Sequence, residues 1–336
     1  MAQTNRAEEM PVGRAVAPTK SRFVRALALV GDPWGYLLVL PAILLYAIFE
    51  IWPIIRGLMM AFSPYSWVVP ETKGLLTFNG LDNYRELLRT QEWRHSMWVS
   101  LKFTLGSFPL NFVLAMFTAV MISKVANPRW SGFFRIVSYL PVVLPLSTAM
   151  LVWANLYQTQ YGYLNHFLKM VLHIKNPPIW LDDYKWALFS AVIPTVWKRF
   201  GSDTMLFLIG IYSINRELYE AAEIDGANEW QQFWKVTLPL LKPIIVLVLV
   251  LSAGLVSATA EIMVLFSRGG GWVTESYSVT GGPFQAALTP GVWAWAVAFV
   301  RPDMRMGLAA SASLILGLIH MTLSAIVFKT VRVERF

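Results

Sequence analysis

Long apolar stretches alternate with shorter polar ones along this chain, and the apolar stretches have the length of membrane spans. A helix needs about 20 mostly apolar residues to cross the hydrocarbon core of a bilayer. Inside lipid the backbone must satisfy its own hydrogen bonds, so we expect every span to be helical. The sequence therefore predicts an all-α, polytopic membrane protein with six transmembrane helices. The predicted spans are residues 36–62, 96–123, 136–158, 186–212, 243–266 and 304–328.

The ends of the chain are polar and basic, and they delimit the predicted membrane domain. Residues 1–32 form an N-terminal tail, 33–328 the transmembrane domain and 329–336 a C-terminal tail. A cleaved signal peptide is disfavoured, because the first apolar stretch is too long for one. Lys and Arg are more frequent in the tails and in the loops on the same side as the tails. This bias predicts that both termini are cytoplasmic.

One polar segment, residues 215–239, interrupts the apolar pattern between the fourth and fifth spans. It has too many charges to lie in lipid: Arg216, Glu217, Glu220, Glu223, Asp225, Glu229 and Lys235. We expect two short helices, the first capped by Asn215 and ended by Asp225-Gly226. Asn228 and Gln231 have the spacing of a capping box for the second helix. Two ordered helices on the cytoplasmic side predict a surface on which another protein docks, rather than a flexible linker between two spans.

The composition agrees with a membrane protein. The chain is 56% hydrophobic and 14% charged, whereas a soluble domain has about 25% charged residues. Its 15 Trp and 12 Tyr suit the two membrane interfaces. The net charge of +8 favours contact with anionic lipid over binding to nucleic acid. With no Cys, the chain has no disulfide, thiolate nucleophile or Cys-based metal site.

No catalytic or metal-binding pattern is present. The sequence lacks GxxxxGK[ST], so we expect no ATP hydrolysis by this chain alone. It also lacks HExxH, GxSxG and a Rossmann glycine pattern. The four His residues are far apart. We therefore predict no catalytic residues, no metal ligands, no cofactor of its own and no enzymatic activity.

Five charged residues fall inside the predicted spans, where burial is costly unless a charge is paired or faces water. They are Glu50, Arg56, Lys198, Arg199 and Glu261. One interpretation is a polar pathway through the bundle, and the other is ion pairing or placement near a span end. Both remain open for Lys198 and Glu261, whereas the second is favoured for Glu50 and Arg56.

Aromatic residues near the third and fourth spans suggest where a solute could pass. Their rings could stack on sugar rings, but they equally suit core packing or interfacial anchoring. The candidate substrate-pathway residues are Trp153, Asn155, Tyr157, Trp197, Lys198 and Glu261.

The polar segment resembles a known signature. ELYEAAEIDGANEWQQFWKVTLPLLKP is similar to the EAA signature of ABC importer permease subunits, on Glu220-Ala221-Ala222, Gly226 and Leu238-Pro239. In the first span, residues 40–63 resemble the opening of carbohydrate-type permeases. Residues 79–87, 132–165 and 196–222 continue this resemblance in the same order. The resemblance covers about residues 35–265.

This resemblance implies a permease of the bacterial or archaeal cytoplasmic membrane. It implies a second similar permease, two ATPase subunits that bind ATP and Mg²⁺, and an extracytoplasmic solute-binding protein. The residues implied in ATPase coupling are Glu220, Ala221, Ala222, Asp225, Gly226, Leu238 and Pro239. The implied solute is a sugar or oligosaccharide. The alternative solutes are a glycerol phosphate ester, a polyamine or iron. A further alternative for the class of protein is a secondary transporter, although no clear internal repeat is present.

Two departures from the family pattern leave the solute open. Gly269-Gly270-Gly271 is followed by Trp272 where family members often have Pro, and Ala260-Glu261-Ile262-Met263 replaces a short polar stretch. The role of the outer segment 267–300 is also open, and it could include a re-entrant or interfacial helix.

Overall fold

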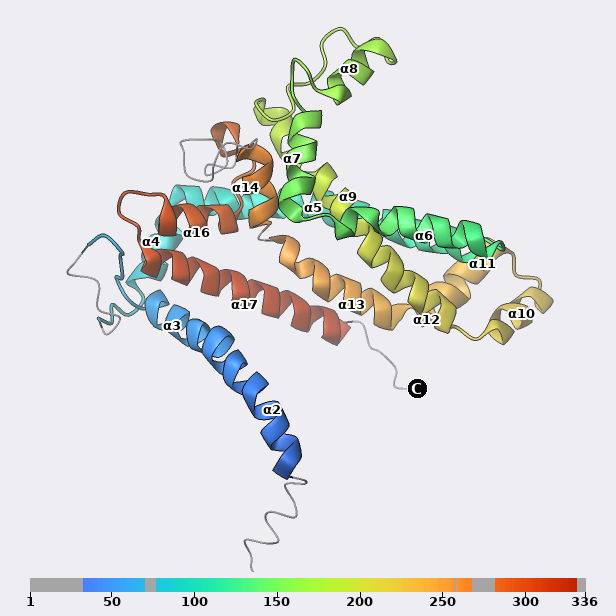
Figure 1. Ribbon diagram of the computed structural model, residues 1–336, viewed down its shortest axis with the longest axis horizontal. Helices are drawn as coiled ribbons and strands as arrows, with labels where there is room; N and C mark the ends of the chain where they lie inside the picture. The colour runs from blue at the N-terminus through green and yellow to red at the C-terminus, as the bar shows by residue number, and fades with distance from the viewer. Residues whose placement is uncertain (1–32, 70–76, 257, 268–281, 331–336) are drawn as a thin grey trace, which may run out of the picture. The chain divides into compact units, whose positions relative to one another are not determined.

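The computed structural model describes residues 33–69, 77–256, 258–267 and 282–330 (Figure 1). Within these residues the chain forms helices and connecting loops and no strand, which confirms the all-α class. The two predicted tails lie almost wholly outside the described residues, as does Gly269-Gly270-Gly271. The chain divides into two compact units, Met1–Arg56 and Gly57–Phe336, which are described separately.

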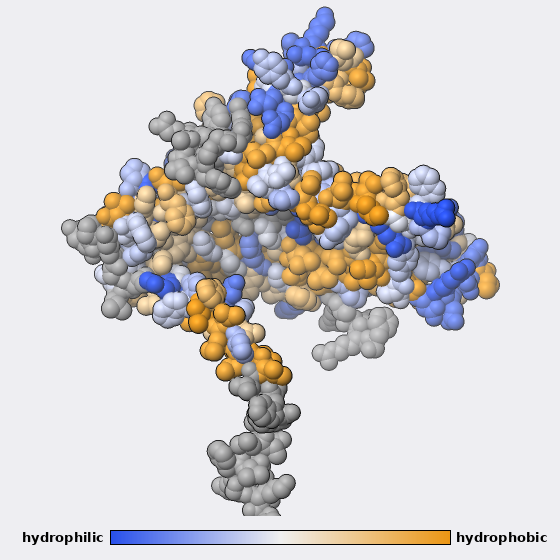
Figure 2. Space-filling model, viewed as in Figure 1, coloured by the Kyte–Doolittle hydropathy of each residue, from blue (hydrophilic) through white to orange (hydrophobic). Residues whose placement is uncertain are grey.

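The first unit contains α2 (Pro33–Tyr46), a π-helical turn η1 (Ala47–Ile51) and the start of α3 (Trp52–Ala61). The π turn ends just before Trp52-Pro53, where the proline lacks the N–H that a regular helix uses. From Leu38 on, the side chains of this unit are almost all exposed and mostly apolar (Figure 2), as suits contact with lipid or another chain. Glu50 and Arg56 are exposed and form no ion pair among the described residues.

In the second unit, α5 (Gln91–Ser123) and α9 (Tyr184–Ser213) are the two longest helices and pack along each other. They match the predicted second and fourth spans. α17 (Met306–Thr330) matches the sixth. Short helices α4 (Asp82–Arg89) and α8 (Tyr163–Met170) lie in the predicted outer loops.

The predicted third span, residues 136–158, is broken into two helices. α6 (Pro128–Val143) and α7 (Leu146–Leu156) are bent by 95°, and Figure 1 shows them running in different directions. The bend falls at Leu144-Pro145, since proline disfavours helical geometry in the residue before it. The helix continues through Pro141, the other proline of this span.

The predicted fifth span is also interrupted. α13 (Lys242–Ser252) is followed by a 3₁₀ turn η4 (Ala253–Val256) and then by α14 (Thr259–Ser267). Gly254 lies in the turn, and the preceding Val-rich helix ends at Ser252. In the outer segment, η5 (Pro283–Gln285) precedes α16 (Pro290–Phe299), a ten-residue apolar helix too short to span a bilayer.

Length and composition alone identify three described helices able to cross a membrane: Leu38–Ala61, Gln91–Ser123 and Met306–Thr330. The number rises to five if each bent pair, Pro128–Leu156 and Glu229–Ser252, is one span. The 30-residue α9 is not among them. The middle of this helix carries three charged residues, Lys198, Arg199 and Asp203.

Two hydrophobic clusters form the core of the second unit. The first includes Phe103, Tyr157, Phe266 and Trp293, and the second includes Phe207 and Leu241. Both α5 and α9 contribute to both clusters, so these two helices connect the two halves of the core.

Ion pairs join α4 to the start of α17. Arg305 donates to both carboxylate oxygens of Glu86, and one of these contacts measures 2.6 Å. The Arg305 guanidinium holds the pKa of Glu86 below its ordinary value. Glu92 similarly accepts from Arg301 and from the Trp293 indole. These contacts close the end of the bundle opposite to the polar segment along α5 and α17.

Candidate functional site

The polar segment forms two helical parts, as the sequence predicts. α10 (Arg216–Ile224) begins at Asn215, whose side chain accepts from the backbone N–H of Glu217. The second part begins at α11 (Glu229–Gln232) and continues through a π turn η3 (Phe233–Thr237) into α12 (Leu238–Leu240). Asn228 and Gln231 form the predicted capping box, with hydrogen bonds of 2.9 and 3.0 Å. Local capping therefore defines both helix starts.

Gly226 makes the turn between the two parts. Its φ is +80°, a conformation that costs residues with a Cβ about 1–2 kcal/mol. No atom lies within 4 Å of where its Cβ would be. The requirement for glycine is thus a matter of backbone conformation, and not of crowding within this chain.

α10 presents its side chains to the surroundings. None of its residues is buried. Leu218 and Ile224 are 46% and 87% exposed, although both are large and apolar. Glu220 is also exposed and pairs with Arg216 one turn earlier, at 3.0 Å. Exposed apolar side chains beside carboxylates are typical of a helix that another protein covers.

The two parts of the segment are fixed to each other. The hydroxyl groups of Tyr219 and Thr237 lie 2.9 Å apart, and Gln232 donates to the carbonyl of Ala227. Ala227 N–H also donates to the carbonyl of Ala222. These hydrogen bonds hold α10 and the η3–α12 part in one arrangement relative to each other.

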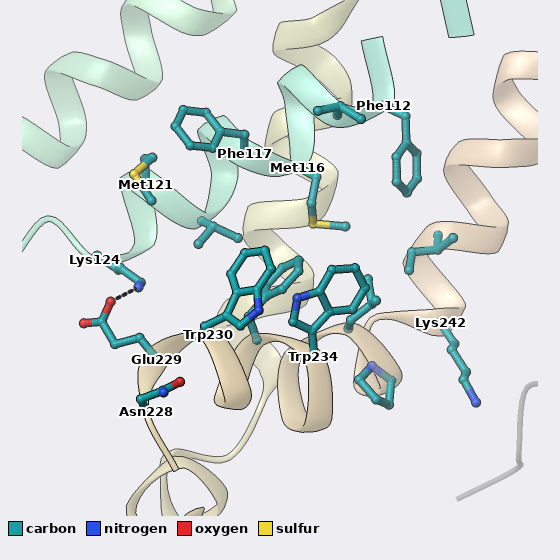
Figure 3. A pocket seen from close by; sticks show the side chains of 16 residues that line it. Phe112, Met116, Phe117, Met121, Lys124, Asn228, Glu229, Trp230, Trp234 and Lys242 are labelled. Carbon is teal, nitrogen blue, oxygen red and sulfur yellow. Dashed lines mark hydrogen bonds and ion pairs between the residues drawn. The ribbon is translucent and has the colours of Figure 1, made fainter. Parts of the chain in front are cut away.

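The second part also lies against the end of α5. Figure 3 shows the indoles of Trp230 and Trp234 facing Met116 and Phe117 across an apolar groove of about 1090 Å³. Lys124, directly after α5, pairs with Glu229 at 2.5 Å. Leu238 packs against the second core cluster, and Pro239 lines the groove. Of the predicted coupling residues, Leu238 and Pro239 thus join the segment to the bundle, whereas Glu220 to Gly226 face outward.

The middle of the bundle contains a buried polar network that links several helices. Asp203, on α9, is only 2% exposed and accepts from Arg199 Nε at 3.3 Å and from Asn111 Nδ2 at 2.6 Å. Arg199 Nη2 donates to Ser252 Oγ at 3.2 Å. Beside it, Lys198 Nζ donates to the carbonyl of Val142 at 3.0 Å. We call the four side chains that bond to one another, Asn111, Arg199, Asp203 and Ser252, the Arg199 network.

Sequence reasoning missed Asp203, although it considered Lys198 and Arg199. The signal was present, because Asp203 follows Arg199 by four residues and such a pair meets on one helix face. Asn111 on α5 gave no comparable signal, because its position against Asp203 depends on how the two helices pack. Arg199 is therefore ion-paired, but its partner is Asp203 and not one of the other four charged residues considered.

The candidate pathway aromatics lie in one chain of ring contacts. Trp153 contacts Tyr157 and Trp197, with ring centroids 5.5 and 5.8 Å apart. Tyr157 in turn contacts Trp180 at 5.4 Å and is 1% exposed in the first core cluster. The structure therefore brings Trp153, Tyr157 and Trp197 together and buries the Tyr157 ring among packing side chains.

The remaining candidate residues have separate surroundings. Asn155 is exposed and donates to the carbonyl of Leu151 on its own helix. Glu261 is half-buried in the first turn of α14, which packs against α7 and α9. Lys198 donates to the carbonyl of Val142 at the end of α6.

Comparison with known proteins agrees with this arrangement. Residues 111–332 match the family described as binding-protein-dependent transport system inner membrane component. The trehalose/maltose transport system permease protein MalF of Thermococcus litoralis is 31% identical over 73% of this chain and 81% of its own. The lactose transport system permease protein LacF of Rhizobium radiobacter is 28% identical, covering 90% and 95%.

A solved structure has the same fold. It is a bacterial alginate ABC transporter in complex with alginate pentasaccharide-bound periplasmic protein. The TM-score is 0.73 at 21% identity, over 93% of this chain and 96% of the other. The present chain belongs to the family of binding-protein-dependent transport system inner membrane components. It is a multi-pass membrane permease, as its EAA-like segment predicts.

Proposed function

We propose that this chain is a permease subunit of an ATP-driven importer for a sugar or oligosaccharide, and that α10 with Gly226 is its docking site for a separate ATPase. The observation that carries the proposal is the exposed, locally capped α10, which joins directly to α9. Trehalose/maltose and lactose in the names of relatives and alginate in the structural relative support a saccharide as solute.

In this proposal the chain forms half of the transmembrane pathway. A second homologous permease forms the other half, and two ATPase subunits bind ATP and Mg²⁺. An extracytoplasmic solute-binding protein delivers the solute, as in the alginate complex. The protein resides in a bacterial or archaeal cytoplasmic membrane with both termini and the polar segment in the cytoplasm. The chain itself catalyses no reaction.

The coupling residues have separate tasks. Glu220, Ala221 and Ala222 form the contact face of α10, with Glu220 offering a carboxylate to a basic partner group. Asp225 and Gly226 form the turn that directs the helix. Leu238 and Pro239 join the segment to the bundle. Closure of the ATPase then moves the spans as rigid bodies through these contacts.

The proposed solute pathway is lined by aromatic rings and polar groups. Trp153 and Trp197 offer half-buried ring surface, and Asn155 and Glu261 offer hydrogen-bonding groups. Such a combination of rings and polar groups suits a saccharide. The Tyr157 ring supports Trp153 from the core side.

Substitution of Gly226 tests the coupling. Valine at a φ of +80° strains the turn, so we expect Gly226→Val to bind the ATPase but to transport little solute per ATP hydrolysed. Gly80→Val is the matched control, since Gly80 has a φ of +62° and open space but lies before α4. Normal uptake by Gly226→Val, with the ATPase still bound, would refute the coupling role.

The solute and the topology are tested separately. Uptake across a panel of sugars, with and without this subunit, should show loss for one saccharide class. Loss of uptake for a polyamine, iron or a phosphate ester instead would overturn the sugar assignment. A cysteine at Ile224, in a chain without cysteine, should resist membrane-impermeant thiol reagents applied to intact cells. Labelling from outside would reverse the orientation.

A further inference from the structure

Two adjacent cations on α9 each bond to the helix end at which a different predicted span is interrupted. Lys198 Nζ donates to the carbonyl of Val142, next to the last residue of α6, where the 95° bend to α7 follows. Arg199 Nη2 donates to Ser252 Oγ, on the last residue of α13, before the 3₁₀ turn η4. Both interruptions are therefore tied to the same turn of α9.

Arg199 is held in place by its neighbours. Its Nε donates to Asp203 Oδ2, and that same oxygen accepts from Asn111 on α5. Asp203 is buried, and a buried carboxylate is tolerated when it is paired and hydrogen-bonded. The guanidinium thus has a fixed orientation, with one edge on Asp203 and the other on Ser252. The bond to α13 is consequently a constraint on the position of that helix end.

Close packing couples α6 to the same turn of α9. A Cβ added at Gly201 would lie 2.1 Å from the carbonyl oxygen of Ser138, so the two backbones touch there. Further along, Arg135 Nη2 donates to the Tyr212 hydroxyl at 2.8 Å. α6 is therefore fixed to α9 at three places, and the last of them, Lys198 to Val142, is the one nearest to the bend.

The same helix leads directly to the polar segment. α9 is uninterrupted from Tyr184 to Ser213, and only Ile214 separates it from the cap of α10. Ser213 follows Lys198 by fifteen positions, a distance of about 22 Å along a helix axis. Lys198 and Arg199 lie on the same continuous helix whose end adjoins α10 (Figure 1). A displacement of α10 therefore moves both residues through α9.

We propose that Lys198 and Arg199 are positioning residues that transfer the movement of α10 to the two interruptions, α6–α7 and α13–η4. This inference rests on the proposed coupling function and goes beyond it by naming the route. The two cations act on helix geometry, and the solute is not their ligand. Asp203 and Asn111 serve to orient Arg199.

The test uses the complete importer in proteoliposomes, with the variants Lys198→Met and Arg199→Met/Asp203→Leu, the second of which removes both members of the buried ion pair. We expect assembly with the ATPase and basal hydrolysis to persist, while solute transported per ATP falls about tenfold, within the usual range of coupling effects. Arg199→Lys, which keeps one donor, should lie between. Lys185→Met is the matched control, an exposed lysine on the same helix, and should behave as the unchanged protein.

A second readout follows the helices themselves. Spin labels on cysteines at Ile224 of α10 and Val152 of α7, both exposed, report their distance with and without trapped ATP. In the unchanged importer we expect the distance between the two labels to change when ATP is trapped. In Lys198→Met we expect a smaller change in this distance.

The outcomes separate the two proposals. Transport per ATP and label distances equal to those of Lys185→Met would overturn the positioning role. A raised KM for the solute with unchanged transport per ATP would also overturn it, because it would make Lys198 or Arg199 a solute ligand. Absence of ATP-dependent transport in the unchanged complex would instead refute the proposed function.

Discussion

The polar segment and the middle of the bundle both contain charged side chains, in opposite surroundings. On α10, Glu220 and Arg216 are 58% and 89% exposed and pair with each other at the surface. On α9, Asp203 is 2% exposed and is bonded to two other helical positions. An exposed pair contributes little to stability, whereas a buried pair cannot lose one member without a large cost. The charges of α10 are therefore available to a partner, and those of α9 hold the bundle together.

Substitutions in the two regions should consequently fail in different ways. In the bundle, those that separate packed helices or leave a buried charge unpaired should reduce the amount of folded protein. In the polar segment they should leave folded protein intact and alter its work with the ATPase.

The largest effect is expected at Gly201. A methyl group there meets the carbonyl of Ser138 at 2.1 Å, so Gly201→Ala must separate α6 from α9. We expect most of the monodisperse peak to be lost in detergent size-exclusion chromatography. Gly132→Ala on α6 is the control, because nothing lies within 4 Å of its Cβ and alanine is the better helix former. Equal yields of the two variants would mean that α6 and α9 are not in contact at Gly201.

The next effect is at Asp203. Asp203→Asn leaves the Arg199 guanidinium without its carboxylate, and breaking a buried ion pair costs about 3–5 kcal/mol. We expect a clear fall in the thermal unfolding midpoint. Replacing both members, as Arg199→Met/Asp203→Leu, should recover most of the loss. If the double variant is as unstable as the single one, the two charges are not partners.

Substitutions in the polar segment should lower the stability of the fold less than substitutions in the bundle. Asn228→Ala removes a capping box from α11 and should cost about 1 kcal/mol locally. Because this helix start lies at the surface, the melting midpoint of the whole chain should hardly change, while transport per ATP falls. A drop in the midpoint as large as that of Asp203→Asn would contradict the contrast between the two regions.

These two regions also differ in how far they could be predicted from the sequence. The start of α10, its end at Asp225-Gly226 and the capping box were predictable, because each depends on residues within four positions of one another. The bend between α6 and α7 was not, since Pro141 and Pro145 both lie in the predicted span and only the second coincides with a break.

The Arg199 network was only partly predictable for the same reason. Arg199 and Asp203 are four residues apart on one helix, but Asn111 and Ser252 approach them through packing. The aromatic chain from Trp153 to Trp180 likewise depends on the loop after α7 folding back. The solute pathway stays a prediction, because a span's sequence does not specify which of its faces lines a cavity.

The smallest effect is expected at the opposite end of the bundle. Arg305 lowers the pKa of Glu86, so this pair adds stability above the ordinary pKa of a glutamate, and the gain is lost as the pH falls through the lowered pKa. Both side chains are more than a third exposed, which limits the gain to about 0.2–1 kcal/mol. Glu86→Gln should therefore lower the melting midpoint slightly at pH 7 and by less at pH 3. A difference as large at pH 3 as at pH 7 would exclude the ion pair as its cause.

Cross-linking of α10 to the ATPase tests the central claim most directly. The chain contains no cysteine, so Ile224→Cys introduces a single thiol at a side chain that is 87% exposed. With the co-expressed ATPase we predict a specific cross-linked product at this position. No such product should form at Tyr161→Cys, which is 86% exposed in the loop after α7. Cross-linking to the ATPase at Tyr161 but not at Ile224, in an active importer, would contradict the account.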